Sequence, residues 1–124
     1  MKEIIHTKEA PAAVGPYSQA VSTGSLLFVS GQLPMDPVTM EMPKDVQAQA
    51  KQSLTNLESI LKEAGLGLKD VVKTSVFIKN MDDFGAVNEI YAQFFQDLHP
   101  ARSCVEVARL PKDALVEVEA IATF

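Results

Sequence analysis

The stretch PARSCVEVARLPKD (residues 100–113) decides the fold, together with the segment ALVEVEAIATF (residues 114–124) that follows it. Pro100 keeps the chain out of a helix where it enters the first segment. Side chains then follow the period-two pattern of strands over Ser103–Ala108 and again over Leu115–Phe124. A short turn-like segment with a proline and two charges separates the two runs. Two strands with so short a connection predict an antiparallel hairpin.

Such a hairpin would bring four chemically active side chains into one neighbourhood: Arg102, Cys104, Glu117 and Glu119. The planar guanidinium of Arg102 can bind a carboxylate through two parallel hydrogen bonds. Glu117 and Glu119 share one face of a strand, where a carboxylate could orient water or act as a base. The spacing alone is equally compatible with an ion pair at the strand entrance and a solvated glutamate face.

The composition indicates one globular domain that spans residues 1–124. Hydrophobic residues make up 47% of the chain and charged residues 22%, which is typical of a folded protein. A net charge of −5 disfavours broad binding to nucleic acid or anionic lipid. The single cysteine cannot form an internal disulfide, and we find neither the apolar core of a signal peptide nor a membrane-spanning run. We therefore expect a cytoplasmic protein.

The predicted elements alternate in a simple order: three strands, a helix, a strand, a second helix and two strands. Beyond the two strands above, strands are expected at Lys2–Thr7, Ser18–Ser22, Leu26–Ser30 and Lys69–Lys79, and helices from Pro43 to Ala64 and from Asn80–Asp83 to His99. The apolar inner stripe of the second helix would consist of Phe84, Val87, Tyr91, Phe94 and Leu98. Two amphipathic helices can cover only one face of about six strands. The sequence thus predicts an α+β two-layer sandwich, whose other sheet face meets solvent or another subunit.

Three stretches of the chain, taken together, resemble the signature of the RidA/YjgF family of reactive-intermediate deaminases. They are APAAVGPYSQ (residues 10–19), SGQ (residues 30–32), and RSCVEVARLPKD with EVEAIA (residues 102–113 and 117–122). The resemblance runs from end to end, and a signature of this length is more specific than a short motif. It implies a chorismate-mutase-like fold, and a homotrimer with ligand sites in the clefts between subunits.

The resemblance also implies a role for individual residues. Arg102 would hold a substrate carboxylate, helped by Ser30 and the Gly31 amide, while Glu117 would position water. The expected substrate-binding residues are Arg102, Ser30, Gly31, Asn88 and Cys104, and the expected catalytic residues are Glu117, Arg102, Tyr17 and Cys104, the last through its backbone carbonyl. A thiol mechanism at Cys104 is disfavoured because nothing places His99 beside it as a base.

The implied reaction is the hydrolysis of enamines and imines to 2-keto acids and ammonia without a cofactor or metal. Substrates would be 2-aminoacrylate, 2-aminocrotonate and their 2-imino acid tautomers, released by pyridoxal-phosphate-dependent dehydratases, as for a 2-iminobutanoate/2-iminopropanoate deaminase. One alternative is a trimer that binds keto acids or serves the purine pathway without turnover; an RNA-directed or chaperone role fits the acidic charge less well. The connection Gln96–Ala101 is shorter than in some relatives, with His99 where others have an aromatic residue, which leaves the preferred side chain open.

Overall fold

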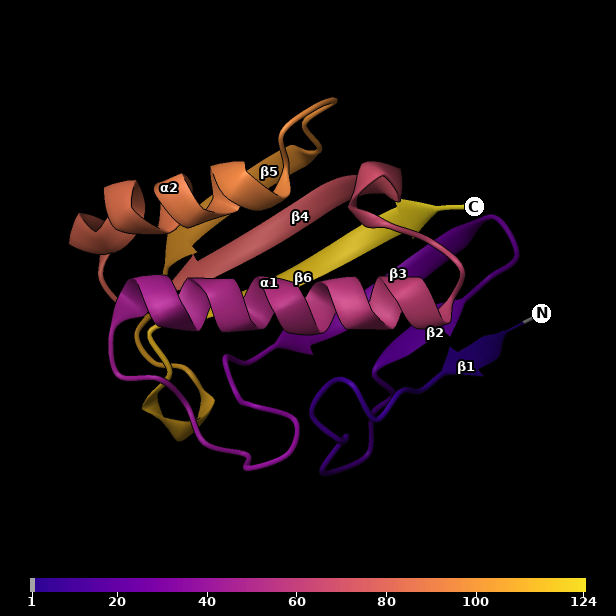
Figure 1. The fold of residues 1–124 in the computed structure, drawn as a ribbon, viewed down its shortest axis with the longest axis horizontal. Helices are drawn as coiled ribbons and strands as arrows, with labels where there is room; N and C mark the ends of the chain where they lie inside the picture. The colour runs from indigo at the N-terminus through magenta and orange to yellow at the C-terminus, as the bar shows by residue number, and fades with distance from the viewer. Residues whose placement is uncertain (1) are drawn as a thin grey trace.

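The fold is a mixed sheet covered on one face by two helices, as a computed structural model shows for residues 2–124 (Figure 1). Within these residues, the strands are β1 (Glu3–Ile5), β2 (Ala20–Ser22), β3 (Leu26–Gln32), β4 (Val71–Ile78), β5 (Ala101–Glu106) and β6 (Val116–Thr123), and the α-helices are α1 (Val46–Glu63) and α2 (Phe84–Phe94). The strand order is β1-β2-β3-β6-β4-β5. The predicted α+β two-layer fold is confirmed.

The helix α1 begins and ends at side chains that suit those positions. Asp45 caps its start by accepting a hydrogen bond from the Ala48 N–H at 2.8 Å. Gly65 follows its end with a φ of +79°, a conformation that glycine adopts without strain. Pro43, which we expected in the first helical turn, lies before the cap. In the described chain, no helix is long and apolar enough to cross a membrane.

The helix α2 ends earlier than the sequence pattern predicts. Asn80 caps the turn before it, as expected, by accepting a hydrogen bond from the Asp82 N–H. The backbone leaves helical geometry at Phe95, so the predicted inner stripe stops at Phe94. Leu98 was expected on that stripe and is instead 88% exposed. The apolar spacing in the sequence continues past the residue at which the helix ends. The pattern therefore placed Leu98 on the helix, where it does not lie.

The pairing of β5 corrects the predicted hairpin. β5 lies at the edge of the sheet and pairs in parallel with β4 alone, while β6 lies between β3 and β4 and is antiparallel to both. The physical reason is that α2 returns the chain to the same end of the sheet, which makes β4-α2-β5 a parallel crossover unit. Residues 107–115 then carry the chain past β4. The predicted β2–β3 hairpin is confirmed.

The two faces of the sheet differ in what covers them. On β6, alternate residues face α1 and α2 and form the core: Val116, Val118, Ala120 and Ala122, each 3% exposed or less. The other residues of β6, among them Glu117 and Glu119, face the side without helices. That open face also presents Phe28 and Val105, which are 43% and 45% exposed. The core therefore lies entirely between the helices and one face of the sheet.

Candidate active site

Arg102 is held against α2 at the edge of the sheet. It lies opposite Thr74 in the β4–β5 register, and so on the helix-covered face. Its Nη1 donates a hydrogen bond to Oδ1 of Asn88 at 2.7 Å. Its guanidinium carbon lies 4.7 Å from the centroid of the Tyr91 ring and 5.4 Å from that of Phe84, which are cation–π distances. One amide and two aromatic rings thus restrain the guanidinium.

A cavity of about 390 Å³ opens beside this guanidinium. It is lined by Asn88, Tyr91, Ala92, Phe95, His99, Pro100 and Arg102. Within residues 2–124, Arg102 makes a side-chain hydrogen bond only through Nη1, which leaves the rest of its planar fork to bind an anion. Carboxylate and phosphate are the anions whose geometry matches that fork, and a carboxylate is the smaller of the two. This cavity can therefore bind a small carboxylic acid.

Tyr91 and Phe84 are site residues that sequence reasoning placed in the apolar stripe of α2. The Tyr91 hydroxyl is 2.7 Å from Oγ1 of buried Thr74, which fixes the ring beneath the guanidinium. Burial raises the pKa of Tyr91 above its ordinary value, although the bond to Thr74 and the charge of Arg102 act in the opposite direction. The available signal was spacing, because residues 84, 88 and 91 share one helix face.

Glu117 lies against Gly31 on the open face. β3 carries a bulge where Val29 pairs with Ala120 and Gln32 pairs with Val118, so that two residues of β3 oppose one of β6. A Cβ on Gly31 would lie 2.9 Å from both Cδ and Oε2 of Glu117. Position 31 is thus a glycine because the carboxylate of Glu117 occupies the space that a side chain would fill.

The Glu117 carboxyl holds its proton more tightly than an ordinary glutamate. Burial raises its pKa, and the nearby charge of Glu119 raises it further. A desolvated carboxyl with a raised pKa takes up a proton more readily than an ordinary glutamate, as a general base must. This arrangement can perform acid–base chemistry.

Hydrogen bonds from Ser30 hold the loop that carries Tyr17. Ser30 donates from Oγ to the Ser18 carbonyl at 2.6 Å and from its N–H to the Gln19 carbonyl at 2.9 Å. Tyr17 itself is 50% exposed. The role of Gln19 was not predicted: its buried side-chain amide bonds to the backbone of Thr7, Ala10 and Pro11. Gln19 is the last residue of the stretch at residues 10–19 that resembles the family signature, and this position was the sequence signal that could have drawn attention to it.

The predicted site residues fall into two groups on opposite faces of the sheet. Arg102, Asn88 and Cys104 lie on the helix-covered side, whereas Glu117, Gly31 and Ser30 lie together at the β3 bulge, with Tyr17 on the adjoining loop. β4 lies between β5, which carries Arg102, and β6, which carries Glu117. On β4, Thr74 pairs with Arg102 and Phe77 pairs with Glu117, and these two residues face opposite sides of the sheet. The predicted neighbourhood of Arg102 and Glu117 within one chain is therefore wrong, because β5 and β6 are not adjacent.

The thiol of Cys104 is poorly placed to act as a nucleophile. Burial raises its pKa, although the charge of Arg102 acts in the opposite direction. His99 lines the cavity beside Arg102, and in the described chain it makes no hydrogen bond to the thiol. A partly buried thiol with a raised pKa and no base bonded to it is a poor nucleophile.

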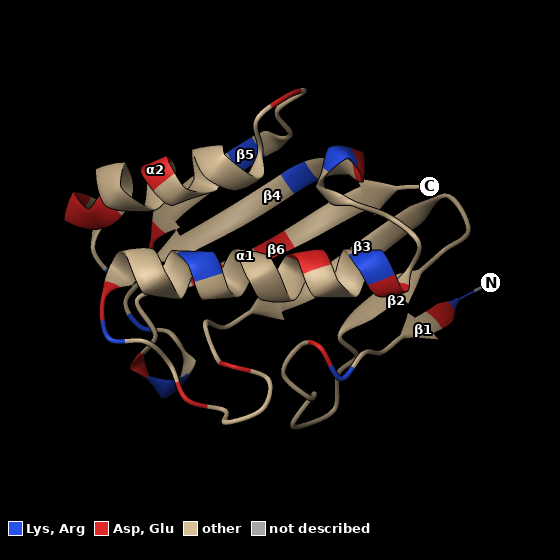
Figure 2. Cartoon of the chain, viewed as in Figure 1, with Lys and Arg blue, Asp and Glu red and all other residues tan. Residues whose placement is uncertain are grey.

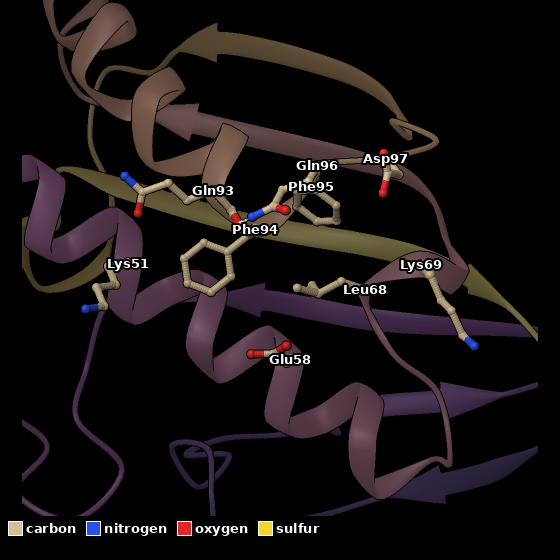
Figure 3. Close-up of a pocket in the computed structure, with 9 residues that line it drawn as sticks. All are labelled: Lys51, Glu58, Leu68, Lys69, Gln93, Phe94, Phe95, Gln96 and Asp97. Atoms are coloured by element: carbon tan, nitrogen blue, oxygen red, sulfur yellow. Dashed lines mark hydrogen bonds between the residues drawn. The ribbon is translucent and has the colours of Figure 1, made fainter.

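A larger groove of about 530 Å³ lies between α1 and the end of α2 (Figure 3). Its rim carries charges of both signs, from Lys51, Lys69, Glu58 and Asp97, around the ring of Phe94. No predicted site residue is among the described residues that line it. Nor do residues 2–124 contain a cluster of histidine, cysteine and acidic side chains able to hold a metal ion.

Comparisons with known proteins identify the family. The family model described as "Endoribonuclease L-PSP" matches residues 7–124. A 2-iminobutanoate/2-iminopropanoate deaminase of Escherichia coli (strain K12) is 54% identical over 125 residues, which cover 98% of each chain. The crystal structure of the E. coli YjgF gene product superposes with a TM-score of 0.95, at 52% identity over 98% of each chain. This chain belongs to the RidA/YjgF family.

A second solved RidA/YjgF structure contains a small molecule. It is E. coli TdcF with bound serine, which superposes with a TM-score of 0.96 at 52% identity over 98% of each chain. Serine carries a carboxylate, the group for which the Arg102 fork is suited. A RidA/YjgF protein can thus bind a ligand of amino-acid size.

Proposed function

We propose that this protein hydrolyses reactive enamines and imines to 2-keto acids and ammonia. Its substrates would be 2-aminoacrylate, 2-aminocrotonate and their 2-imino acid tautomers, as for a 2-iminobutanoate/2-iminopropanoate deaminase. The observation that carries the proposal is the restrained guanidinium of Arg102 at the wall of a cavity, bound to Asn88 at 2.7 Å. The E. coli relative named for this reaction supports it, at 54% identity.

We further propose that the protein is a homotrimer with its sites in the clefts between subunits. In one chain Arg102 and Glu117 face opposite sides of the sheet, so both can contact one small substrate only if neighbouring subunits supply them. The exposed Phe28 and Val105 of the open face support an assembly that buries this face.

In the proposed mechanism, Arg102 binds the substrate carboxylate through two charge-assisted hydrogen bonds. Ser30 and the Gly31 amide assist it. Glu117 orients a water molecule, with help from Tyr17 and the Cys104 carbonyl, and accepts its proton as the oxygen attacks the imine carbon. A proton then returns to the nitrogen, which leaves as ammonia: R–C(=NH)–COO⁻ + H2O gives R–CO–COO⁻ + NH3. An imine is already electrophilic, so placement and acid–base help suffice without a cofactor.

The reaction would act on what pyridoxal-phosphate-dependent dehydratases release, and this supplies the test. A serine or threonine dehydratase generates the enamine in the presence of semicarbazide, which traps the free imine. We expect this protein to increase the rate of keto-acid release and to decrease the semicarbazone formed. Unchanged trapping at increasing protein concentration would contradict the proposal.

The second candidate is a trimer that binds keto acids or amino acids without turnover, and the serine bound to TdcF favours it. A binder needs only Arg102, so it would bind pyruvate in a calorimetric titration and leave trapping unchanged. An RNA-directed role, as the family model's description suggests, is disfavoured by the net charge of −5. Figure 2 shows lysine and arginine separated by other residues rather than gathered into one stretch.

A further inference from the structure

We propose that Tyr91 and Thr74 are positioning residues for Arg102. Their buried hydrogen bond sets where α2 lies over β4, and so holds the guanidinium in the orientation that binds a substrate carboxylate. This inference rests on the proposed deaminase function, and within it on carboxylate capture by Arg102. It adds two residues to the carboxylate-binding half of the site.

Arg102 needs such support because it is an exposed side chain on an edge strand. β5 pairs with β4 alone, and the side chain of Arg102 reaches from it toward α2. A long side chain in solvent samples many rotamers, whereas two parallel hydrogen bonds to a carboxylate require one orientation of the guanidinium plane. A guanidinium that is already restrained loses less freedom on binding, and therefore binds more tightly.

The ring of Tyr91 is the closer of the two aromatic contacts of this guanidinium. Its centroid lies 4.7 Å from the guanidinium carbon, against 5.4 Å for the ring of Phe84. Tyr91 is only 7% exposed, and its ring also packs against that of buried Phe95, with 4.7 Å between the centroids. The ring thus joins the core to the cation, and a displaced ring would displace the guanidinium with it.

The hydroxyl of Tyr91 is bonded to the sheet at the level of Arg102. It lies 2.7 Å from Oγ1 of Thr74, which is fully buried on β4. Thr74 is also the residue of β4 that pairs with Arg102 in the parallel register. A hydrogen bond has a preferred length and direction, whereas hydrophobic burial is non-directional. The bond therefore fixes the distance between α2 and β4 where the guanidinium is held.

A purely structural role would not require two polar groups at this place. Phenylalanine and valine have nearly the shapes of tyrosine and threonine, and replacing both partners of a buried hydrogen bond by such groups can leave stability almost unchanged. Other residues of the same core, among them Val76, Val87 and Phe95, are apolar. A satisfied polar pair among apolar neighbours specifies one arrangement, and here it does so next to Arg102.

The test removes each hydroxyl and measures carboxylate binding. Tyr91→Phe keeps the ring and Thr74→Val keeps the shape, so both should fold. We expect each to increase the Kd for pyruvate, measured by calorimetry, by about fivefold, the factor that corresponds to one ordinary hydrogen bond. The KM for imine hydrolysis should rise by the same factor with kcat nearly unchanged, because the carboxylate is bound in both the substrate and the transition state. Thr74→Ser, which keeps a hydroxyl, should bind pyruvate like the unmodified protein.

The double variant Tyr91→Phe with Thr74→Val tests whether the two residues act through their bond. If they do, it should bind pyruvate about as weakly as either single variant, whereas independent effects would multiply to roughly 25-fold. Val87→Ala is the control for loss of stability, because Val87 is buried in the same helix and belongs to the core. It should decrease the free energy of unfolding and leave the Kd unchanged.

The outcomes separate this inference from the proposed function. An unchanged Kd in both Tyr91→Phe and Thr74→Val, independent effects in the double variant, or an equal increase in Val87→Ala would overturn the inference and leave the deaminase function standing. Weakened pyruvate binding in the two hydroxyl variants of a protein that hydrolyses no imine would support the positioning of Arg102, while the deaminase function fails. An unmodified protein that binds no pyruvate would overturn the inference through carboxylate capture itself.

Discussion

The helix-covered face of the sheet is complete within one chain, whereas the open face is not. Val116, Val118 and Ala122 are almost fully buried beneath α1 and α2, while Phe28 and Val105 on the other side remain more than two-fifths exposed, at 43% and 45%. The first face supplies most of the hydrophobic stabilisation that one subunit can provide. The second face has the apolar surface that subunit association needs. Stability and the proposed assembly would thus depend on opposite sides of the same strands.

The residues of the proposed mechanism are divided between the same two faces of the sheet. Arg102 is restrained by residues of α2, so the carboxylate-binding group depends on the helix-covered layer. Glu117 is restrained by the β3 bulge at Gly31, so the acid–base group depends on the open face. A folded monomer would contain both halves of the site without joining them. Activity should therefore depend on assembly as well as on folding.

The largest effect is expected from Phe28→Lys, which places a charge on the open face. We expect it to convert a trimer into a folded monomer and to abolish imine hydrolysis, because burying an unpaired charge at an interface is very unfavourable. Analytical ultracentrifugation measures the assembly, and circular dichroism the fold. Val38→Lys is the control, since Val38 is 87% exposed in a loop away from the sheet. A trimeric, active Phe28→Lys protein would show that the open face is not the interface.

The next largest effect is expected from Arg102→Ala. Loss of two charge-assisted hydrogen bonds of about 1.5–3 kcal/mol each corresponds to a decrease in kcat/KM of roughly 10²–10⁴-fold. The exposed side chain contributes little to the core, so fold and assembly should persist. Arg109→Ala is the matched control, because its ion pair with Asp113 is solvent-exposed at 3.4 Å. Unchanged turnover in Arg102→Ala would refute carboxylate capture by this residue.

Glu117→Gln should decrease kcat by about 10²-fold, the lower end of general-base effects, and leave pyruvate binding intact. Because burial and Glu119 raise the pKa of Glu117, activity should fall with decreasing pH at a higher pH than for an ordinary glutamate. Glu119→Gln removes one of these causes and should move that limb to lower pH. A pH profile of kcat checks both. If activity still falls at the same acidic pH in Glu119→Gln, the group that titrates there is not Glu117.

The same pKa shift affects stability in a defined direction. The folded state binds the Glu117 proton more tightly than the unfolded state, so its favourable contribution is complete at low pH. That contribution is lost as the pH rises through the folded pKa. At neutral pH, Glu117→Gln should accordingly increase the free energy of unfolding while it decreases activity.

A smaller effect is expected from Gly31→Ala, which tests the bulge. The new Cβ would lie 2.9 Å from the Glu117 carboxyl and displace it, with a decrease in kcat of about tenfold. Gly67→Ala is the control, because a Cβ there meets nothing within 4 Å. The KM should change little, since Arg102 is untouched. Normal kcat in Gly31→Ala would show that the carboxylate does not depend on this contact.

Sequence periodicity predicted the faces of the strands correctly and their neighbours poorly. The alternation in Val116–Thr123 identified its buried side, since a period of two follows directly from backbone geometry. It could not reveal that β4 lies between β5 and β6, because pairing depends on the crossover that α2 makes. Likewise, apolar spacing extended α2 toward Leu98, although the chain leaves the helix at Phe95.

The sequence predicted candidate site residues where the family signature covers them and overlooked one that has the spacing of a core residue. Arg102 and Glu117 lie within quoted motifs, but Tyr91 has the spacing of a packing residue and gives no other signal. Its second role becomes visible only when the guanidinium is seen 4.7 Å from its ring. Gln19 lies within a quoted motif and its role was still missed, because its hydrogen bonds go to backbone atoms that a sequence does not locate.

The smallest effect is expected on the helix-covered face, at Ser53. It is fully buried in α1, and in the described chain its Oγ has no hydrogen-bond partner. Ser53→Ala removes an unpaired hydroxyl and introduces a better helix former, so the free energy of unfolding should rise by about 1 kcal/mol with activity unchanged. Asn56→Ala is the contrasting variant, because its amide bonds to the carbonyls of Leu33 and Met35 and its loss should destabilise the fold. Urea denaturation measures both. A destabilised Ser53→Ala protein would mean that the Ser53 hydroxyl has a hydrogen-bond partner in solution. That partner would be a water molecule within the helix-covered face.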